Sequence, residues 1–237
     1  MNIIITGASK GLGKAIALRF AAAENTLFLG ARNEQSLQAT ASEIKILYPH
    51  CTIHIYSVDV TKLEQLQAFA NFCLQIATPD ILINNAGKFL PGAIYQEPEG
   101  LLKEMIETNL YSAYHLTRMV LPNMLQQIKI TNTHKHIFNI CSIASLQPYA
   151  NGGSYSISKF ALLGFSKNLR EELKPHLIKV TAVMPGATYT DSWIGSGVQE
   201  DRIMQANDVA AMVYAAAQLS PQACVEDIVM RPQLGDL

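Results

Sequence analysis

The sequence has little of what marks membrane, metal-binding or nucleic-acid-binding proteins. Its longest apolar run, near 209–217, is too short to cross a bilayer. Its six histidines are scattered without the spacing of a zinc site. The formal net charge of −1 leaves no excess of basic residues for the phosphates of a nucleic acid. We therefore expect no metal, no membrane and no nucleic acid among the partners.

Cysteine pairs and targeting signals are also missing. The four cysteines form no C-x-x-C pair, which is typical of reduced, mostly buried thiols. The first residues, MNIIITGASKG, pass from an apolar segment straight into a glycine turn and do not resemble a signal peptide. No repeat, low-complexity tract or linker divides the chain. These features predict a cytoplasmic protein with a single domain over 1–237.

What is present is a regular alternation of short apolar segments with longer helical patterns. Hydrophobic residues make up 49% of the chain and charged residues 16%, enough for a large core. Strands are expected at 2–6, 26–30, 52–57, 80–84, 135–141, 177–183 and 224–230. Helices are expected near 11–23, 34–47, 61–76, 99–125, 154–173 and 207–218. Because several strands are apolar almost throughout, the pattern predicts a doubly wound parallel α/β sheet with helices on both faces, whose ligands bind where the strands end.

A glycine-rich turn, TGASKGLG at 6–13, lies between the first strand and the first helix. Gly7, Gly11 and Gly13 permit a tight turn and a close approach of the backbone to a pyrophosphate, which the N-terminus of the helix attracts. The spacing is looser than the usual dinucleotide pattern, and a P-loop is excluded because Ala15 stands where Ser or Thr is needed. The turn indicates a dinucleotide site; a glycine turn without a ligand is the alternative.

The end of the second strand, LFLGARN, bears on which dinucleotide is bound. NAD sites place an acidic residue here on the ribose hydroxyls, whereas this sequence has Ala31 and Arg32. A guanidinium can hold a 2′-phosphate through charge-assisted hydrogen bonds, and Lys10 in the glycine turn adds a second positive charge. We therefore expect NADP(H) to be preferred over NAD(H), unless Arg32 and Lys10 are only solvated surface charges.

Tyr155 and Lys159, in NGGSYSISKF at 151–160, lie four residues apart and so share one face of a helix. An ammonium beside a phenol can support proton transfer, although two solvated side chains would have the same spacing. Ser142 lies just past the fifth strand, 13 residues before Tyr155. Gly152 and Gly153 are interpreted as slack that lets Tyr155 turn into the cleft.

Five motifs in register resemble the short-chain dehydrogenase/reductase family. They are T-G-x-x-x-G-x-G at 6–13, N-N-A-G at 84–87, Ser142, Y-x-x-x-K at 155–159 and P-G-x-x-x-T at 185–190. Their order and spacing match the family from the first strand to about residue 190. The resemblance implies a Rossmann-type sheet of seven strands in the order 3-2-1-4-5-6-7. It also implies hydride transfer between NADP(H) and a small-molecule carbonyl or alcohol substrate.

The resemblance implies a catalytic role for four residues. Tyr155 would be the general acid in ketone reduction and the base in the reverse direction. Lys159 would stabilise its phenolate, together with the positive nicotinamide, and would bond the nicotinamide ribose. Ser142 would hold the carbonyl oxygen of the substrate, and Asn109 would support a water-linked proton relay to Lys159.

The cofactor contacts transfer in the same way. Asp59 would accept from the adenine amino group and Val60 would pack on the ring, although Asp59 also reads as a helix N-terminal acid beside a capping Thr61. Asn85 and Gly87 would flank the adenosine ribose. The full set of implied contacts is Gly7, Ser9, Lys10, Gly11, Leu12, Gly13, Ala31, Arg32, Asp59, Val60, Asn85, Ala86, Gly87, Tyr155, Lys159, Pro185, Gly186, Thr188 and Thr190.

Two other functions stay open at this point. A 3-oxoacyl-carrier-protein reductase would need a basic patch for its acidic partner, and the C-terminus lacks the glycine-rich ending usual in the bacterial enzymes. A catalytically silent cofactor-binding regulator would lack one of the four catalytic residues, and all four are present.

Cys141, beside Ser142, is interpreted as a buried structural thiol. The resemblance further implies a homodimer or homotetramer that pairs the helices at 99–125 and 154–173.

Overall fold

The first strand shows how this sequence builds its core. The structure, a computed structural model, describes residues 1–131, 134–190, 193, 195 and 197–237. In β1 (Asn2–Thr6) three successive isoleucines are completely buried. Ile3 and Ile5 belong to one hydrophobic cluster and Ile4 to another, because alternate residues of a strand point to opposite faces. A strand that is apolar throughout therefore has a core on each side.

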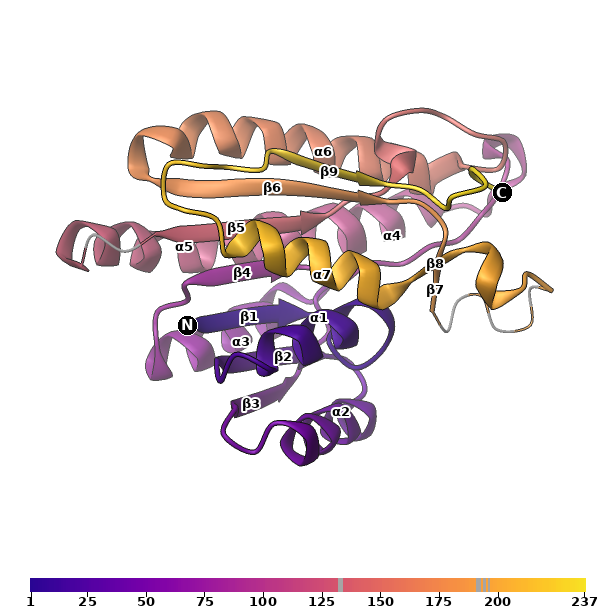
Figure 1. The fold of residues 1–237 in the computed structure, drawn as a ribbon. Coiled ribbons are helices and arrows are strands. Elements are labelled where there is room, and N and C mark those ends of the chain that lie inside the picture. Colours follow the sequence, from indigo (N-terminus) through magenta and orange to yellow (C-terminus); the bar gives the residue numbers. More distant parts are fainter. Residues whose placement is uncertain (132–133, 191–192, 194, 196) are drawn as a thin grey trace.

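Seven parallel strands form the sheet in the order β3-β2-β1-β4-β5-β6-β9 (Figure 1). This order confirms the predicted 3-2-1-4-5-6-7 arrangement, with β9 as the seventh strand. The chain order reverses between β1 and β4, and ligands of such sheets bind at that point. The strands besides β1 are β2 (Thr26–Ala31), β3 (Thr52–Ser57), β4 (Ile81–Asn84), β5 (Lys135–Ile140), β6 (Ile178–Pro185) and β9 (Asp227–Met230).

Helices cover both faces of the sheet, as the apolar strands predict. One cluster packs α1 (Gly11–Ala21), α2 (Glu34–Leu47) and α7 (Ala206–Ala217) on the first face. The other packs α3 (Leu63–Ile76), α5 (Ser112–Thr131) and α6 (Gly153–Leu173) on the second. Short 3-10 turns lie at Ile94–Gln96, Ile143–Ser145, Lys174–His176 and Glu200–Arg202. No helix among the described residues is long and apolar enough to cross a membrane.

The helix expected over 99–125 differs from the prediction. It begins as α4 (Leu101–Ile106), continues through a π-helical turn at Glu107–Tyr111, and runs on as α5 to Thr131. Gly100, with φ of 86°, sets its start, and Pro122 lies inside the helix without ending it. The π-helical turn places one extra residue in the helix at the position of Asn109.

The last strand is also shorter than expected, because it starts at Asp227 rather than at residue 224. Side chains also bond the backbone carbonyls just before it, and the Glu226 oxygen still accepts from the Ala182 amide of β6 at 2.9 Å. The Thr181 hydroxyl donates to the Val225 oxygen at 2.6 Å, and Arg170 Nη2 donates to the Glu226 oxygen at 2.7 Å. A pair of two-residue strands, β7 (Thr188–Tyr189) and β8 (Met204–Gln205), was not predicted and joins the two ends of the segment between them.

Candidate active site

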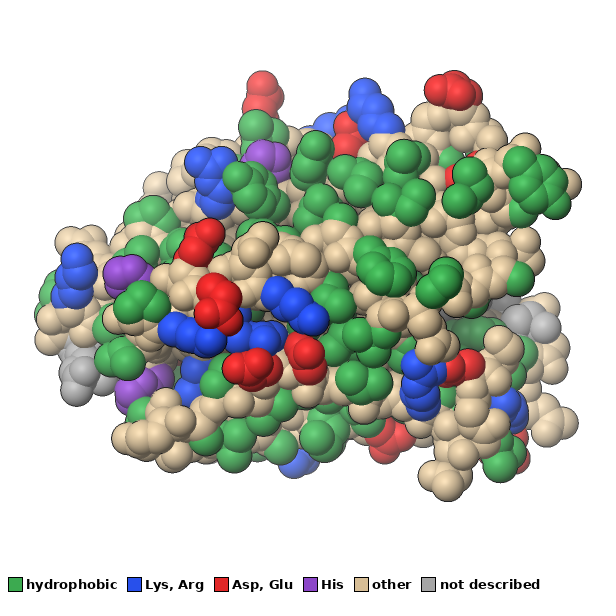
Figure 2. Space-filling view, turned by 90° about the horizontal axis from the view of Figure 1, so that it is seen from above, with side chains coloured by type: hydrophobic (Ala, Val, Ile, Leu, Met, Phe, Trp, Pro, Cys, Tyr) green, Lys and Arg blue, Asp and Glu red, His purple; other side chains and the backbone are tan. Residues whose placement is uncertain are grey.

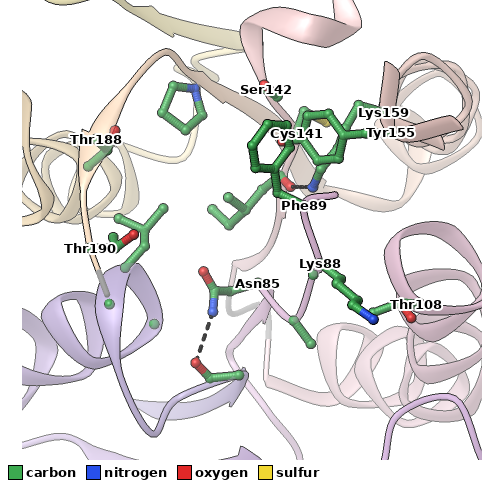
Figure 3. Close-up of a pocket in the computed structure, with 18 of the residues that line it drawn as sticks. Asn85, Lys88, Phe89, Thr108, Cys141, Ser142, Tyr155, Lys159, Thr188 and Thr190 are labelled. Carbon is green, nitrogen blue, oxygen red and sulfur yellow. Dashed lines mark hydrogen bonds between the residues drawn. The ribbon is translucent and has the colours of Figure 1, made fainter. Parts of the chain in front are cut away.

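A cavity of about 910 Å³ lies at the carboxyl ends of the strands. Every residue predicted to contact the cofactor lines it, and so does Ser142. Asn109 does not line the cavity. In Figure 3, Ser142, Tyr155 and Lys159 lie together, Thr188 and Thr190 lie opposite, and Asn85 lies between the two groups. The predicted site residues, far apart in sequence, are therefore brought to one place.

The glycine turn fits a dinucleotide because it lines the cavity and leaves no room for side chains at its glycines. Gly7 and Gly11 have φ of +66° and +53°, which favour glycine. A Cβ on Gly13 would lie 2.3 Å from the Gly7 carbonyl oxygen and 2.4 Å from Asn85 Nδ2. Helix α1 begins at Gly11, so its free N–H groups face the cavity that the turn lines.

Asn85 ties the glycine turn to the end of β4. Its Nδ2 donates to the carbonyl oxygens of Thr6 at 2.8 Å and Gly7 at 3.2 Å. The Thr6 hydroxyl oxygen in return accepts from the amides of Asn85 at 3.1 Å and Ala86 at 3.0 Å. Thr6 begins the T-G motif but was not predicted as a site residue; it acts here by holding two strand ends together.

Asp59 follows β3 and Arg32 follows the neighbouring strand β2, and the two charges interact. Burial raises the pKa of Asp59, but hydrogen bonds from Thr61 and the charges of Arg32 and Lys62 outweigh it, so the pKa is lowered overall. Asp59 Oδ1 accepts from the Thr61 amide at 3.0 Å and the Thr61 hydroxyl at 2.8 Å. The expected cap by Thr61 is therefore wrong, because α3 begins only at Leu63 and the Thr61 hydroxyl is engaged by Asp59.

Tyr155 and Lys159 share the first turns of α6, as their spacing predicts. Lys159 is 5% exposed; its Nζ donates to the Ile140 carbonyl oxygen at 2.8 Å and lies 5.8 Å from the centroid of the Tyr155 ring. Burial lowers the pKa of Lys159 to about 8. Burial also raises the pKa of Tyr155 to about 12, and hydrogen bonding by Ser142 acts in the opposite direction. In the protein alone, both groups are therefore pushed toward their neutral forms.

Ser142 is fixed by its position at the end of β5. It caps the turn Ile143–Ser145, and its Oγ accepts from the Ala144 amide at 3.1 Å. Since that contact uses a lone pair, the hydroxyl proton is left to donate into the cavity. Cys141, the preceding residue, is 3% exposed, and burial raises its pKa to about 11. The predicted burial of this thiol is thereby confirmed, and Cys141 also lines the cavity.

Asn109 lies behind the cavity wall, in the π-helical turn. Its Oδ1 accepts from the Lys88 amide at 2.7 Å, and its Nδ2 donates to the Lys88 carbonyl at 3.0 Å and to Ser158 Oγ at 2.9 Å. A Cβ on Gly87 would lie 3.2 Å from Asn109 Oδ1 and 3.6 Å from Lys159 Nζ. The two side chains thus meet at Gly87, and the water-linked relay stays a prediction.

Several cavity residues were not predicted. Phe89 contacts Tyr155 edge-to-face, with ring centroids 4.8 Å apart. Lys88, Phe89, Thr108 and Tyr149 also line the cavity. Lys88 and Phe89 could have been predicted, because they directly follow N-N-A-G at the same strand end as the predicted contacts. Tyr149 and Thr108 follow no motif. The described residues contain no group of His, Cys, Asp and Glu that could hold a metal ion.

Comparison with known proteins places this site in a family. The sequence profile described as short chain dehydrogenase matches residues 1–201. Sepiapterin reductase from Chlorobaculum tepidum is 29% identical over 248 residues, which cover 99% of this chain and 97% of that protein. The closed form of serine dehydrogenase complexed with NADP+ is similar with a TM-score of 0.87 at 26% identity, covering 100% of this chain and 97% of that one. A metagenomic short-chain oxidoreductase in complex with NADP has a TM-score of 0.83 at 28% identity, covering 98% and 97%. The chain therefore belongs to the short-chain dehydrogenase family of oxidoreductases.

Proposed function

We propose that this chain is an NADP(H)-dependent oxidoreductase that transfers hydride between the nicotinamide and a small-molecule carbonyl or alcohol. The observation that carries the proposal is the joint placement of Ser142, Tyr155 and Lys159 in the cavity that the glycine turn also lines. Proton-transfer residues beside a phosphate-binding turn are what reduction by a dinucleotide requires. The cofactor supplies the hydride when bound; the chain supplies the proton and the positioning.

Tyr155 donates the proton to the substrate oxygen in the direction of reduction. With its pKa raised to about 12, the phenol is protonated at neutral pH and is ready to act as an acid. The Ser142 hydroxyl holds the same substrate oxygen and polarises the carbonyl. Lys159, when protonated, stabilises the phenolate that remains after transfer. In the protein alone, burial is the largest cause acting on the pKa of Tyr155. A positively charged nicotinamide, when bound, would lower that pKa.

The preference for NADP(H) is supported by charge at the end of β2. Arg32 lines the cavity directly after Ala31, and Lys10 lines it from the glycine turn. The nearby carboxylate of Asp59 accepts a hydrogen bond from Thr61. It follows β3, the strand next to β2. A 2′-phosphate is therefore met by a guanidinium at the position where NAD sites carry an acid. The NADP named with the two similar structures agrees with this preference.

The test of the proposed function is a panel of ketones and aldehydes followed by loss of NADPH absorbance, with NADH run in parallel. We expect turnover of at least one carbonyl, with kcat/KM about 10- to 100-fold higher for NADPH, the value of one charge-assisted hydrogen-bonding group. Absence of turnover with both cofactors across the panel would contradict the proposed function.

Arg32→Asp should reverse the preference toward NADH, because the carboxylate repels a 2′-phosphate and can accept from a ribose hydroxyl. The measured quantity is the ratio of kcat/KM for the two cofactors. Lys62→Ala is the matched control: Lys62 also acts on Asp59 electrostatically but does not line the cavity. Equal use of NADH and NADPH by the unmodified protein would contradict the proposed role of Arg32 in holding the 2′-phosphate.

A further inference from the structure

We propose that Glu97 is a positioning residue: from the segment between β4 and α4, its carboxylate caps the N-terminus of α6 and so fixes Tyr155 for proton transfer. The inference rests on the proposed function for its catalytic consequence. The cap itself is a property of the fold and has a test of its own. Glu97 does not line the cavity and follows no motif of the sequence.

Two hydrogen bonds join Glu97 to the start of α6. Its Oε1 accepts from the Ser154 amide at 2.8 Å, and its Oε2 accepts from the Ser154 hydroxyl. Helix α6 has 21 residues and no cap of its own, because its N-cap residue is Gly152. A carboxylate at this place satisfies a free N–H group and complements the positive end of the helix dipole. The cap thus comes from a residue 57 positions earlier in the chain.

The backbone around the cap leaves no room for a side chain at Gly153. Gly153 has φ of +39°, and a Cβ there would lie 2.0 Å from Glu97 Oε1 and 2.5 Å from the Gly92 carbonyl oxygen. The Gly92 amide donates to the Asn151 carbonyl at 2.9 Å. The interpretation of Gly152 and Gly153 as slack is therefore wrong. Gly153 lets the two segments pack in close contact, and a Cβ on Gly152 would lie 2.3 Å from Ser156 Oγ.

Tyr155 follows the capped residue directly and is held from its other side as well. Its carbonyl oxygen accepts from Ser158 Oγ at 2.7 Å, and Ser158 Oγ in turn accepts from Asn109 Nδ2 at 2.9 Å. The first turn of α6 is thus anchored before Tyr155 by Glu97 and after it by Asn109. Removal of Glu97 releases the first anchor and leaves Asn109 and Lys159 in place.

Variants of Glu97 test the positioning role through kcat and KM. Glu97→Ala removes both acceptors, and we expect kcat for the best carbonyl of the panel to fall about 10- to 100-fold, the effect of a small misplacement of a reacting group. KM for NADPH should stay unchanged, because the glycine turn is untouched. Glu97→Gln keeps an acceptor for the Ser154 amide and should restore most of the lost kcat. Glu99→Ala removes an exposed carboxylate two residues away and is the matched control.

Amide hydrogen exchange of the NADPH-saturated protein tests the cap without turnover. We expect faster exchange over 152–160 in Glu97→Ala and exchange close to that of the unmodified protein in Glu97→Gln and Glu99→Ala. Unchanged exchange in Glu97→Ala would overturn the cap. Faster exchange with full kcat would overturn the positioning role. If the unmodified protein reduced no carbonyl, the proposed function would fail and with it the catalytic consequence, while the exchange data would still decide the cap.

Discussion

At the residue scale, burial favours the neutral form of both Tyr155 and Lys159. It raises the pKa of Tyr155 to about 12 and lowers that of Lys159 to about 8. Each shift favours the neutral form, since each side chain has lost its contact with water. The Ile140 carbonyl is the one hydrogen-bond partner that the structure gives for Lys159 Nζ among the described residues. The buried charge of Lys159 therefore opposes folding at neutral pH.

This cost predicts how stability depends on pH. Because the pKa of Lys159 is lower in the folded state, the unfolded chain binds more protons between about pH 8 and the ordinary lysine pKa of about 10.4. Relative to Lys159→Met, the unmodified protein should gain about 2 kcal/mol between about pH 8 and about pH 9.5, at ~1.4 kcal/mol per pH unit. Urea unfolding of both proteins measures the difference, and a difference that is constant with pH would contradict the burial of the charge. The raised pKa of Tyr155 acts only above about pH 10, outside this window.

The sequence motifs predicted the residues that line the cavity. They did not predict the residues that hold this lining in place. Ser142, Tyr155 and Lys159 follow strand ends or a helical spacing, so their meeting could be predicted. Glu97 could not, because its partner Ser154 is 57 positions away and both segments lack a motif that names the contact. Side-chain bonds between distant segments depend on loop geometry that a periodicity does not encode.

At the element scale, the glycine turn and helix α6 each contain a glycine, and only the one in the turn leaves no room for a side chain. A Cβ on Gly13 would meet the Gly7 oxygen at 2.3 Å, whereas one on Gly164, within α6, would meet nothing within 4 Å. The first glycine is required by packing between the turn and Asn85. The second is a helix-interior position that is exposed in one protomer, where glycine makes no packing contact inside the chain.

Alanine at these two positions should therefore act in opposite directions. Gly13→Ala should destabilise the protein by about 1–3 kcal/mol through overpacking and should weaken NADPH binding. Gly164→Ala should stabilise it by about 0.5–1 kcal/mol and leave NADPH binding unchanged. Thermal unfolding and NADPH titration of both variants provide the check. Similar effects of the two substitutions would show that the close contacts of Gly13 are not what fixes the turn.

The boundaries of an element could be predicted where the sequence carries a local signal, such as a capping residue. They could not be predicted where contacts with distant residues set them. The helix Glu34–Leu47 matches its prediction at both ends, because Asn33 is a capping residue whose side chain accepts from Ser36. The helix around Asn109 was predicted as continuous, and nothing in its apolar spacing marks the π-helical turn. The last strand was predicted too long: just before it, the Val225 carbonyl accepts from the Thr181 hydroxyl, although the Glu226 carbonyl still accepts from the Ala182 amide of β6.

At the scale of the whole molecule, hydrophobic side chains are exposed on one flank. Ile157 and Phe160 on α6 are each 43% exposed. Tyr111, at the end of the π-helical turn, and Tyr114 on α5 are 49% and 38% exposed. The Tyr114 ring contacts Phe165 of α6 at 5.5 Å, so the exposed groups of the two helices form one surface. Figure 2 views the molecule from the side of α6 and shows hydrophobic side chains reaching the surface among charged ones. We propose that this surface pairs two copies of the chain as a homodimer, from which a homotetramer can be built.

The homodimer predicts a mass of twice 26.0 kDa in light scattering after size-exclusion chromatography. Phe160→Glu should convert it to the monomer, because a carboxylate would be buried without a partner. Ile46→Glu is the matched control, since Ile46 is 79% exposed but lies on α2, away from this surface. A monomeric unmodified protein would contradict the pairing.

The strand order and both helical layers followed from alternation of elements and apolar strands, since burial on two faces restricts such strands to a parallel sheet. The proposed function depends on Tyr155. Tyr155→Phe keeps the ring that packs against Phe89 and removes only the hydroxyl. Tyr214→Phe, on α7 and outside the cavity, serves as the control. The decisive measurement is kcat for carbonyl-dependent NADPH oxidation in these two variants and the unmodified protein. We predict a fall of about 100- to 10,000-fold in Tyr155→Phe with NADPH binding retained and no change in Tyr214→Phe; full activity of Tyr155→Phe would show that another group donates the proton.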